Sequence, residues 1–208
     1  MNEIQAVLFD FGGVLAEEGF SGALEAMAVE QGLRGRDMSA AGAQAVYDSG
    51  FVLGTGTEAD FWSLLRSRTG LHGEDAVLTA RILDGFVLRP WMLQLVERLA
   101  AQGYVTGILS DQTDWLDRLD TRYHFYRLFD RVYNSYYLGK GKRDRSLFTD
   151  VALDLGLPPA HILFIDDNAD NVRRAEAAGM RAIHYRDRRG FIVEIEAILA
   201  GGGRNTRR

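Results

Sequence analysis

Cysteine is absent from the sequence, and proline occurs at only 3 of 208 positions. Without cysteine the chain can form no disulfide, no thiolate metal site and no cysteine nucleophile. The absence suits a reducing compartment, so we expect a cytoplasmic location. No apolar run approaches the ~18 residues of a membrane-spanning helix. Asp10 interrupts the first apolar segment too early for a signal peptide.

Positive charge is also not in excess. The chain has 24 Lys and Arg against 29 Asp and Glu, which gives a net charge of −5. This balance argues against a protein that coats nucleic acid non-specifically. Hydrophobic residues make up 47% of the chain and charged residues 25%, as in ordinary globular proteins. We therefore expect a folded globular chain with neither nucleic acid nor a membrane as its partner.

Short apolar segments alternate with helical patterns over most of the chain. The predicted strands cover residues 4–9, 104–109, 132–134, 162–165 and 181–185. The predicted helices between and after them cover residues 91–101, 114–123, 145–155, 169–178 and 191–199. Such alternation is typical of a parallel sheet with helices on both faces. The sequence therefore predicts an α/β, Rossmann-like, doubly wound core.

A second kind of segment follows the first strand. Residues 17–87 contain helical patterns and no convincing strand, and Thr57 to Asp60 resemble a capping box at the start of one helix. We expect this stretch to form a small helical insert. The core would then comprise residues 1–16 and 88–200. The Gly-rich, basic residues 201–208 are expected to be a disordered tail.

Polar side chains end three of the predicted strands. Asp10 closes the first, Ser110 the second along the chain, and Asp166 with Asp167 a later one. Ligands of such folds bind beyond the carboxyl ends of the strands. Carboxylates from separate strands would repel one another there unless a cation lay between them. The pattern therefore predicts a cation site at this edge of the sheet.

Four motifs together resemble the haloacid dehalogenase-like hydrolase superfamily. They are FDFGGVL at 9–15, Ser110, Lys142 within LGKGKRDRSLF, and FIDDNADN at 164–171. The helical insert resembles the subclass I cap of that superfamily. FIDDNADN and the single acid in FDFGG are most similar to sugar-phosphate phosphatases of the glucose-1-phosphatase type, and to the N-terminal domain of soluble epoxide hydrolases. The resemblance implies a Mg²⁺-dependent phosphatase.

The resemblance also implies the role of each acid. Asp10 would attack phosphorus and form an aspartyl-phosphate, which divides one hard displacement into two easier ones. Asp10 would also bind Mg²⁺, together with the backbone carbonyl of Gly12. Asp167 would be a direct ligand, and Asp166 a ligand either directly or through water.

Phosphate binding is implied for residues between these acids. The Ser110 hydroxyl and the Asp111 N–H would donate hydrogen bonds to phosphate oxygens, and Gln112 stands at a phosphate- or substrate-contact position. Lys142 would neutralise charge on the nucleophile and on the phosphoryl oxygens. Lys140 is a rival for that role. Arg143 and Arg145 replace the two prolines that follow the lysine in the superfamily pattern.

Gly12 departs from the superfamily pattern, which has a second Asp there as general acid/base. Acid/base catalysis is worth roughly 10²–10⁴-fold. Three explanations remain open. In the first, Glu17, Glu18 or Asp111 supplies the proton. In the second, the leaving group scarcely needs a proton, as in a sugar 1-phosphate. In the third, the protein is a slow or inactive relative.

We therefore predict a phosphatase of a small phosphate ester, with a sugar 1-phosphate favoured. The alternative is a pseudoenzyme that binds a phosphorylated ligand or a protein partner. A haloacid dehalogenase is a third alternative, which the Asp166–Asp167 pair opposes because that reaction needs no Mg²⁺. Phe20, Tyr47 and Phe51 are candidate contacts from the insert, and a homodimer is allowed for.

Overall fold

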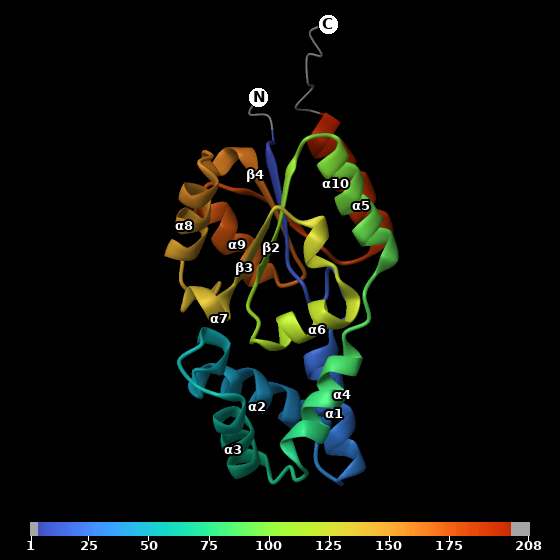
Figure 1. Cartoon of the computed structure of the whole chain (residues 1–208), viewed down its shortest axis with the longest axis vertical. Coiled ribbons are helices and arrows are strands. Elements are labelled where there is room, and N and C mark those ends of the chain that lie inside the picture. Colours follow the sequence, from blue (N-terminus) through green and yellow to red (C-terminus); the bar gives the residue numbers. More distant parts are fainter. Residues whose placement is uncertain (1–3, 201–208) are drawn as a thin grey trace, which may run out of the picture.

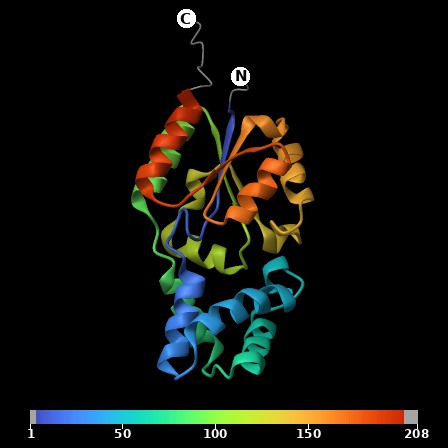
Figure 2. The ribbon, with the colours of Figure 1, turned by 180° about the vertical axis from the view of Figure 1, so that it is seen from behind.

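The computed structural model describes residues 4–200. Five parallel strands form one sheet in the order β3-β2-β1-β4-β5, with helices on both faces (Figures 1 and 2). The strands are β1 (Ala6–Phe9), β2 (Val105–Ser110), β3 (Arg131–Asn134), β4 (Ile162–Asp166) and β5 (Arg181–His184). The predicted α/β, doubly wound fold is confirmed.

The strand order places the functional edge. The chain runs outward from β1 to β3 and then returns to β4 on the other side of β1. Phe9 pairs with Ile108 on one side and with Ile165 on the other, so the ends of the three central strands are level. Asp10 and Asp166 therefore emerge side by side at the crevice where the strand order reverses, which is where ligands bind in such sheets.

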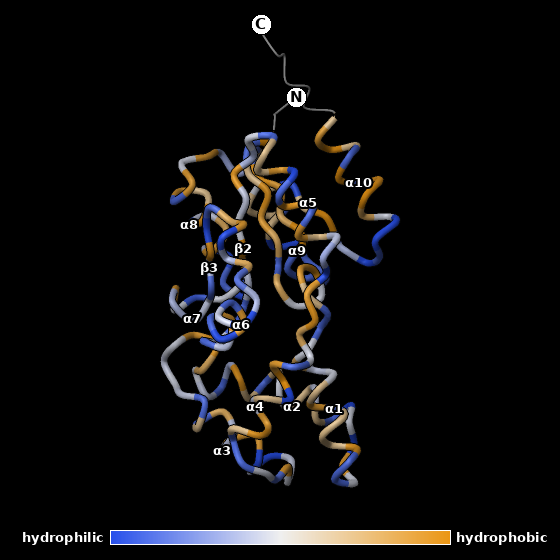
Figure 3. Tube along the Cα trace, turned by 45° about the vertical axis from the view of Figure 1, so that its right-hand side comes forward, coloured by the Kyte–Doolittle hydropathy of each residue, from blue (hydrophilic) through white to orange (hydrophobic). Residues whose placement is uncertain are grey.

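Alternating side chains of the strands build two apolar clusters. Ala6 and Leu8 belong to one cluster, and Val7 and Phe9 belong to the other. The first is covered by α8 (Ser146–Leu155) and α9 (Ala169–Ala177), and the second by α5 (Pro90–Ala101) and α10 (Arg188–Ala200). The central strands β1 and β4 are buried along their whole length, whereas the edge strands β3 and β5 each begin with an exposed arginine. Figure 3 accordingly shows both apolar and hydrophilic segments in this part of the chain.

Four helices lie together beyond the carboxyl ends of the strands (Figure 1). They are α1 (Gly19–Glu30), α2 (Gly35–Asp48), α3 (Glu58–Thr69) and α4 (Asp75–Gly85), with the 3₁₀ turn η1 (Phe51–Leu53) between α2 and α3. We call them the helical layer. The predicted capping box at the start of α3 is present, with the side chains of Thr57 and Asp60 each accepting from the other's backbone N–H. The predicted tail, residues 201–208, lies outside the described residues.

The remaining elements are short. They are α6 (Trp115–Tyr123), α7 (Ser135–Leu138) and the 3₁₀ turns η2 (Tyr126–Leu128) and η3 (Pro159–His161). The sequence did not predict α7, because its four residues are too few to show a helical period; it begins where the Asn134 side chain accepts from the Tyr136 N–H. Within residues 4–200, every helix is too short or too polar to cross a bilayer.

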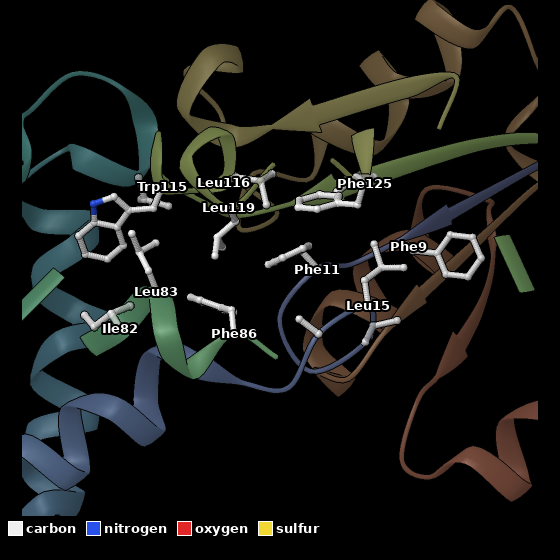
Figure 4. Close-up of a cluster of buried hydrophobic side chains, with 14 of the residues drawn as sticks. Phe9, Phe11, Leu15, Ile82, Leu83, Phe86, Trp115, Leu116, Leu119 and Phe125 are labelled. Carbon is white, nitrogen blue, oxygen red and sulfur yellow. The ribbon is translucent and has the colours of Figure 1, made fainter. Parts of the chain in front are cut away.

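One of the apolar clusters continues from the sheet into the helical layer. Figure 4 shows side chains from β1 and the following turn, from α6 and from the end of α4 gathered in one cluster. Phe11 stacks on Phe125 with ring centroids 5.1 Å apart and lies 5.6 Å from the ring of Phe86. The helical layer is therefore held against the sheet by packed aromatic rings.

Candidate active site

The acids at the strand ends converge on one point. Carboxylate oxygens of Asp10, Asp166 and Asp167 lie within 4.8 Å of one another. A cavity of about 630 Å³ opens beside them, between the sheet edge and the helical layer. Its lining includes Asp10, Gly12, Ser110, Asp111, Gln112, Lys142 and Asp167 from the core, and Glu18, Phe20, Ser21, Val46 and Val52 from the helical layer and the segment leading into it. Most of the sequence-predicted residues thus face a single cavity.

Asp10 has one engaged oxygen and one open oxygen. Its Oδ1 accepts hydrogen bonds from the Phe11 N–H at 2.8 Å and the Ser110 hydroxyl at 2.6 Å, and it lies 2.7 Å from the Lys142 ammonium. No described residue donates to Oδ2. Burial raises the pKa of Asp10 to about 7, against the lowering effect of Lys142. The arrangement fixes the carboxyl group and leaves Oδ2 for a ligand.

Lys142 is a buried cation between two carboxylates. Its side chain is 1% exposed, and Nζ lies 2.7 Å from Asp10 Oδ1 and 2.6 Å from Asp166 Oδ2. Burial lowers its pKa, but Asp10 and Asp166 outweigh burial, so the pKa is raised overall and the group stays charged. The rival Lys140 does not line the cavity. Its ammonium group instead contacts Ser146 and Asp150.

The adjacent acids Asp166 and Asp167 have different surroundings. Asp166 is fully buried and accepts from Lys142, from the Asn168 N–H at 2.7 Å and from the Asn171 amide at 3.2 Å. Asp167 opens to the cavity, and desolvation and the neighbouring Asp166 charge raise its pKa. Asp166 therefore anchors Lys142, whereas Asp167 has free oxygens for a cation.

The helical layer supplies apolar walls to the cavity. Phe20, Val46 and Val52 face it, together with Trp115 of α6. Phe51, expected as a substrate contact, lies outside this lining; it is 1% exposed and its ring packs edge-on against Trp115. It serves the core, because the 3₁₀ turn points it inward.

Polar contacts close one side of the cavity. The Tyr47 hydroxyl of α2 donates to Asp111 Oδ2, and the Lys142 N–H donates to Asp111 Oδ1 at 2.8 Å. Both oxygens of Asp111 are therefore engaged. Trp115 Nε1 donates to Glu58 of α3 at 2.9 Å. These bonds join the helical layer to the core at the cavity rim.

Comparison with known proteins decides the family. The family model for haloacid dehalogenase-like hydrolases matches residues 4–179. The chain belongs to this family. This hydrolase is also 27% identical over 143 residues to the sesquiterpene phosphatase AstK of Aspergillus oryzae. The match covers 67% of this chain and 72% of that protein.

Solved structures of the family share the fold of this hydrolase. A HAD family enzyme of Bacteroides thetaiotaomicron in complex with magnesium and inorganic phosphate has a TM-score of 0.65 and 21% identity, over 88% of this chain and 94% of that one. An L-2-haloacid dehalogenase of Xanthobacter autotrophicus has a TM-score of 0.64 and 20% identity, over 93% of this chain and 83% of that one. At these identities the likeness concerns the fold alone, so the chemistry must be argued from the site.

Two glycines shape the turn after Asp10 in this haloacid dehalogenase-like hydrolase. Gly13 has a φ of +79°, and a Cβ there would lie 2.0 Å from Asp167 Oδ2. Gly12 has no such φ, but a Cβ there would lie 3.3 Å from the Phe86 ring and 3.8 Å from Gln112 Nε2. Gly13 is thus required for the close approach of Asp167, while Gly12 lets the Phe86 ring pack against the turn, with the Gln112 amide nearby.

We expect Gly13→Ala to destabilise the protein more than Gly32→Ala does. Gly32 has a similar φ of +74°, but a Cβ there would have no atom within 4 Å, so this variant reports the backbone strain alone. The additional clash with Asp167 should cost Gly13→Ala about 1–3 kcal/mol more. Urea unfolding of both variants measures this difference. Equal losses would show that Asp167 is not held against the turn.

The three carboxyl groups considered as proton donors are placed differently. Glu17 forms an ion pair with Arg89 at 2.7 Å and lies outside the cavity lining, so it does not face a ligand. Glu18 lines the cavity and caps α1 by accepting from the Ser21 N–H. Asp111 also lines it, but both of its oxygens already accept hydrogen bonds.

His184 is a cavity residue that the sequence does not single out. The four histidines are scattered along the chain without metal-ligand spacing, which predicts no special role for any of them. His184 nevertheless lines the cavity, with Nε2 2.9 Å from the backbone carbonyl of Asp167. Its position at the carboxyl end of β5 is the available signal, because this is the same sheet edge that carries Asp10 and Asp166.

Proposed function

We propose that this hydrolase is a Mg²⁺-dependent phosphatase of a small phosphorylated metabolite, acting through an aspartyl-phosphate on Asp10. The observation that carries the proposal is the open Oδ2 of Asp10, beside the Asp167 carboxylate and the buried Lys142 ammonium, at the wall of a cavity. An oxygen in this position can act as a nucleophile, and the cation beside it favours the approach of a dianion.

The residues present suit a magnesium ion. Mg²⁺ prefers oxygen ligands and keeps some of its waters. Asp10, Asp167 and the Gly12 carbonyl would hold it, with Asp166 acting through water because its own oxygens already accept several hydrogen bonds. When bound, the ion would supply positive charge to the phosphoryl oxygens.

In the proposed reaction Asp10 Oδ2 forms a bond to phosphorus and the alcohol leaves. The Ser110 hydroxyl and the Asp111 N–H would donate to phosphoryl oxygens, and Lys142 would offset the charge that gathers on them. Water then cleaves the aspartyl-phosphate and releases inorganic phosphate. The aromatic and aliphatic walls of the cavity would exclude bulk water from the reacting atoms.

The charge of the cavity limits the substrate. Lys142 is the one Lys or Arg among the lining residues that the structure describes, and two carboxylates already share it. A second anionic group on the substrate would find no free cationic side chain in that lining. This supports a monophosphate ester of a neutral alcohol, as the predicted sugar 1-phosphate is.

A specific observation favours a second candidate substrate. Part of the cavity lining is apolar, with Phe20, Val46, Val52 and Trp115. AstK, whose name describes a sesquiterpene phosphatase, is a relative over most of this chain. A phosphate ester of an apolar, terpene-like alcohol would bury its hydrocarbon against this apolar part of the lining, whereas a sugar would use the polar side chains near Asp111.

We further propose that the helical layer acts as a cap, with residues 17–87 as the cap and residues 1–16 and 88–200 as the core. Support comes from its place over the cavity and from the residues it contributes to the lining. The predicted cytoplasmic location and the homodimer stay predictions.

The test is phosphate release from p-nitrophenyl phosphate with and without Mg²⁺. We expect activity with Mg²⁺ and its loss in a chelator. Asp167→Asn should raise the Mg²⁺ concentration that gives half-maximal activity by about 10- to 100-fold, because changes to metal ligands or to the residues that orient them weaken metal binding by such factors. Asp170→Asn is the matched control, because this nearby exposed side chain contacts Arg173 instead. Binding of Mg²⁺ and phosphate without any turnover would favour the pseudoenzyme.

Three esters compared under the same conditions identify the substrate class. A sugar 1-phosphate hydrolysed faster than its 6-phosphate isomer supports the sugar candidate, and an equal or reversed ratio contradicts it. A terpenyl monophosphate hydrolysed faster than both sugars supports the apolar candidate.

A further inference from the structure

We propose that the side-chain amide of Gln112 donates a hydrogen bond to the leaving-group oxygen of the substrate, in place of the acid that Gly12 lacks. The inference rests on the proposed phosphatase function and adds a role for Gln112 within it. It favours an ester of an alcohol more acidic than an ordinary alkyl alcohol, such as a sugar 1-phosphate, over the terpene-like candidate.

The position of Gln112 supports this role. The residue is half-buried and lines the cavity, and its Nε2 lies 3.8 Å from the place where a Cβ of Gly12 would stand, two residues after the nucleophile. Its side-chain amide has no hydrogen-bond partner among residues 4–200. The amide is therefore the polar side-chain group that the described residues place within 4 Å of the position of a Gly12 Cβ, at the cavity that Asp10 also lines.

The backbone of Gln112 is held in place. Its N–H donates to the Ser135 hydroxyl oxygen at 3.1 Å, and the same hydroxyl lies 3.1 Å from the Gln112 carbonyl. Ser135 is buried, with 1% exposure, and also donates to the Val52 carbonyl at 2.7 Å. Because the backbone is already fixed, contact with a ligand costs only the conformational freedom of the side chain.

The carboxyl groups of the cavity all have other contacts. Asp10 carries the nucleophilic oxygen, and Asp167 faces the proposed cation. Asp111 accepts from Tyr47 and from the Lys142 N–H, and Glu18 caps α1. An uncharged amide is the donor left beside position 12.

An amide stabilises a leaving oxygen without transferring a proton. As the bond from Asp10 Oδ2 to phosphorus forms, the bond from phosphorus to the ester oxygen breaks and its electron pair stays on that oxygen. The N–H of Gln112 stabilises the developing negative charge by a hydrogen bond, and the alcohol then takes its proton from water in the cavity. An alkoxide of a weakly acidic alcohol would leave slowly under these conditions.

The experiment measures kcat/KM for a series of substituted phenyl phosphates with increasing phenol pKa. For Gln112→Ala we expect kcat/KM to fall about tenfold on phenyl phosphate and less than about twofold on p-nitrophenyl phosphate. The hydrogen bond contributes most with a poor leaving group, because its leaving oxygen carries more of the negative charge. Gln112→Met keeps the length of the side chain but has no donor. Like Gln112→Ala, it should make kcat/KM fall more steeply with increasing phenol pKa than in the wild type. The exposed Gln94→Ala is the matched control, with no change expected.

The outcomes separate this inference from the proposed function. Equal losses across the series for both Gln112 variants would overturn the role of Gln112, since a packing defect affects every ester alike. A dependence on phenol pKa unchanged from the wild type would overturn it too. If the wild-type protein hydrolyses none of the esters with Mg²⁺, the proposed phosphatase function itself fails.

Discussion

Asp10→Asn is expected to lower phosphatase turnover by about 10⁴-fold or more while leaving the protein folded, as loss of a covalent nucleophile does. Asparagine keeps an oxygen that can accept from the Phe11 N–H and the Ser110 hydroxyl. Lys142 also keeps its contact with Asp166 at 2.6 Å. The shape and most contacts therefore survive, whereas the anionic nucleophile is lost.

Phosphate release under saturating Mg²⁺ measures this loss, and thermal unfolding checks the fold. Asp144→Asn provides the control, because Asp144 lies two residues from Lys142 but its carboxylate accepts hydrogen bonds from Ser146 at the surface. A folded Asp10→Asn protein that retained more than a few per cent of the activity would contradict the assignment of the nucleophile.

Lys142→Met has the largest expected effect on stability. The substitution leaves Asp10 and Asp166 buried without the cation they share, and breaking a buried pair costs about 3–5 kcal/mol because an uncompensated charge remains. Activity should be lost as well, since nothing else in the described cavity lining replaces the ammonium group. The free energy of unfolding in urea, at neutral pH and without Mg²⁺, measures the effect.

A double variant identifies the cause of this loss. Adding Asp166→Asn to Lys142→Met removes one of the two unpaired carboxylates, so the double variant should be more stable than Lys142→Met alone. Recovery of this kind distinguishes buried charge from lost packing, which the second substitution would not restore. A Lys142→Met protein as stable as the wild type would refute the electrostatic explanation.

The pattern of strands was predictable because burial on both faces leaves continuous apolar runs. Residues 6–9 and 162–165 are such runs, and each ends at a carboxylate. Parallel strands bring their carboxyl ends to one edge, so the gathering of Asp10, Ser110 and Asp166 follows from the strand assignment alone. The motifs then indicated the family, which the comparison confirmed.

Other features depend on packing that no local pattern encodes. Lys140 and Lys142 both lie in one basic run, and only the fold decides that Lys142 is directed between Asp10 and Asp166. Likewise Phe51 points into the aromatic cluster and Val52 into the cavity, although both belong to the same 3₁₀ turn. The proximity of Gln112 to position 12 also joins residues that are far apart in the chain.

The single open oxygen of Asp10 has a stereochemical consequence. Because Oδ1 is engaged by three groups, Oδ2 makes the first displacement in the proposed reaction, and water must then approach the phosphorus from the side that the alcohol has left. Each in-line displacement inverts the phosphorus centre, so two of them restore its original handedness. A phosphorothioate ester made chiral with two heavy oxygen isotopes should yield, in ordinary water, inorganic thiophosphate of retained configuration.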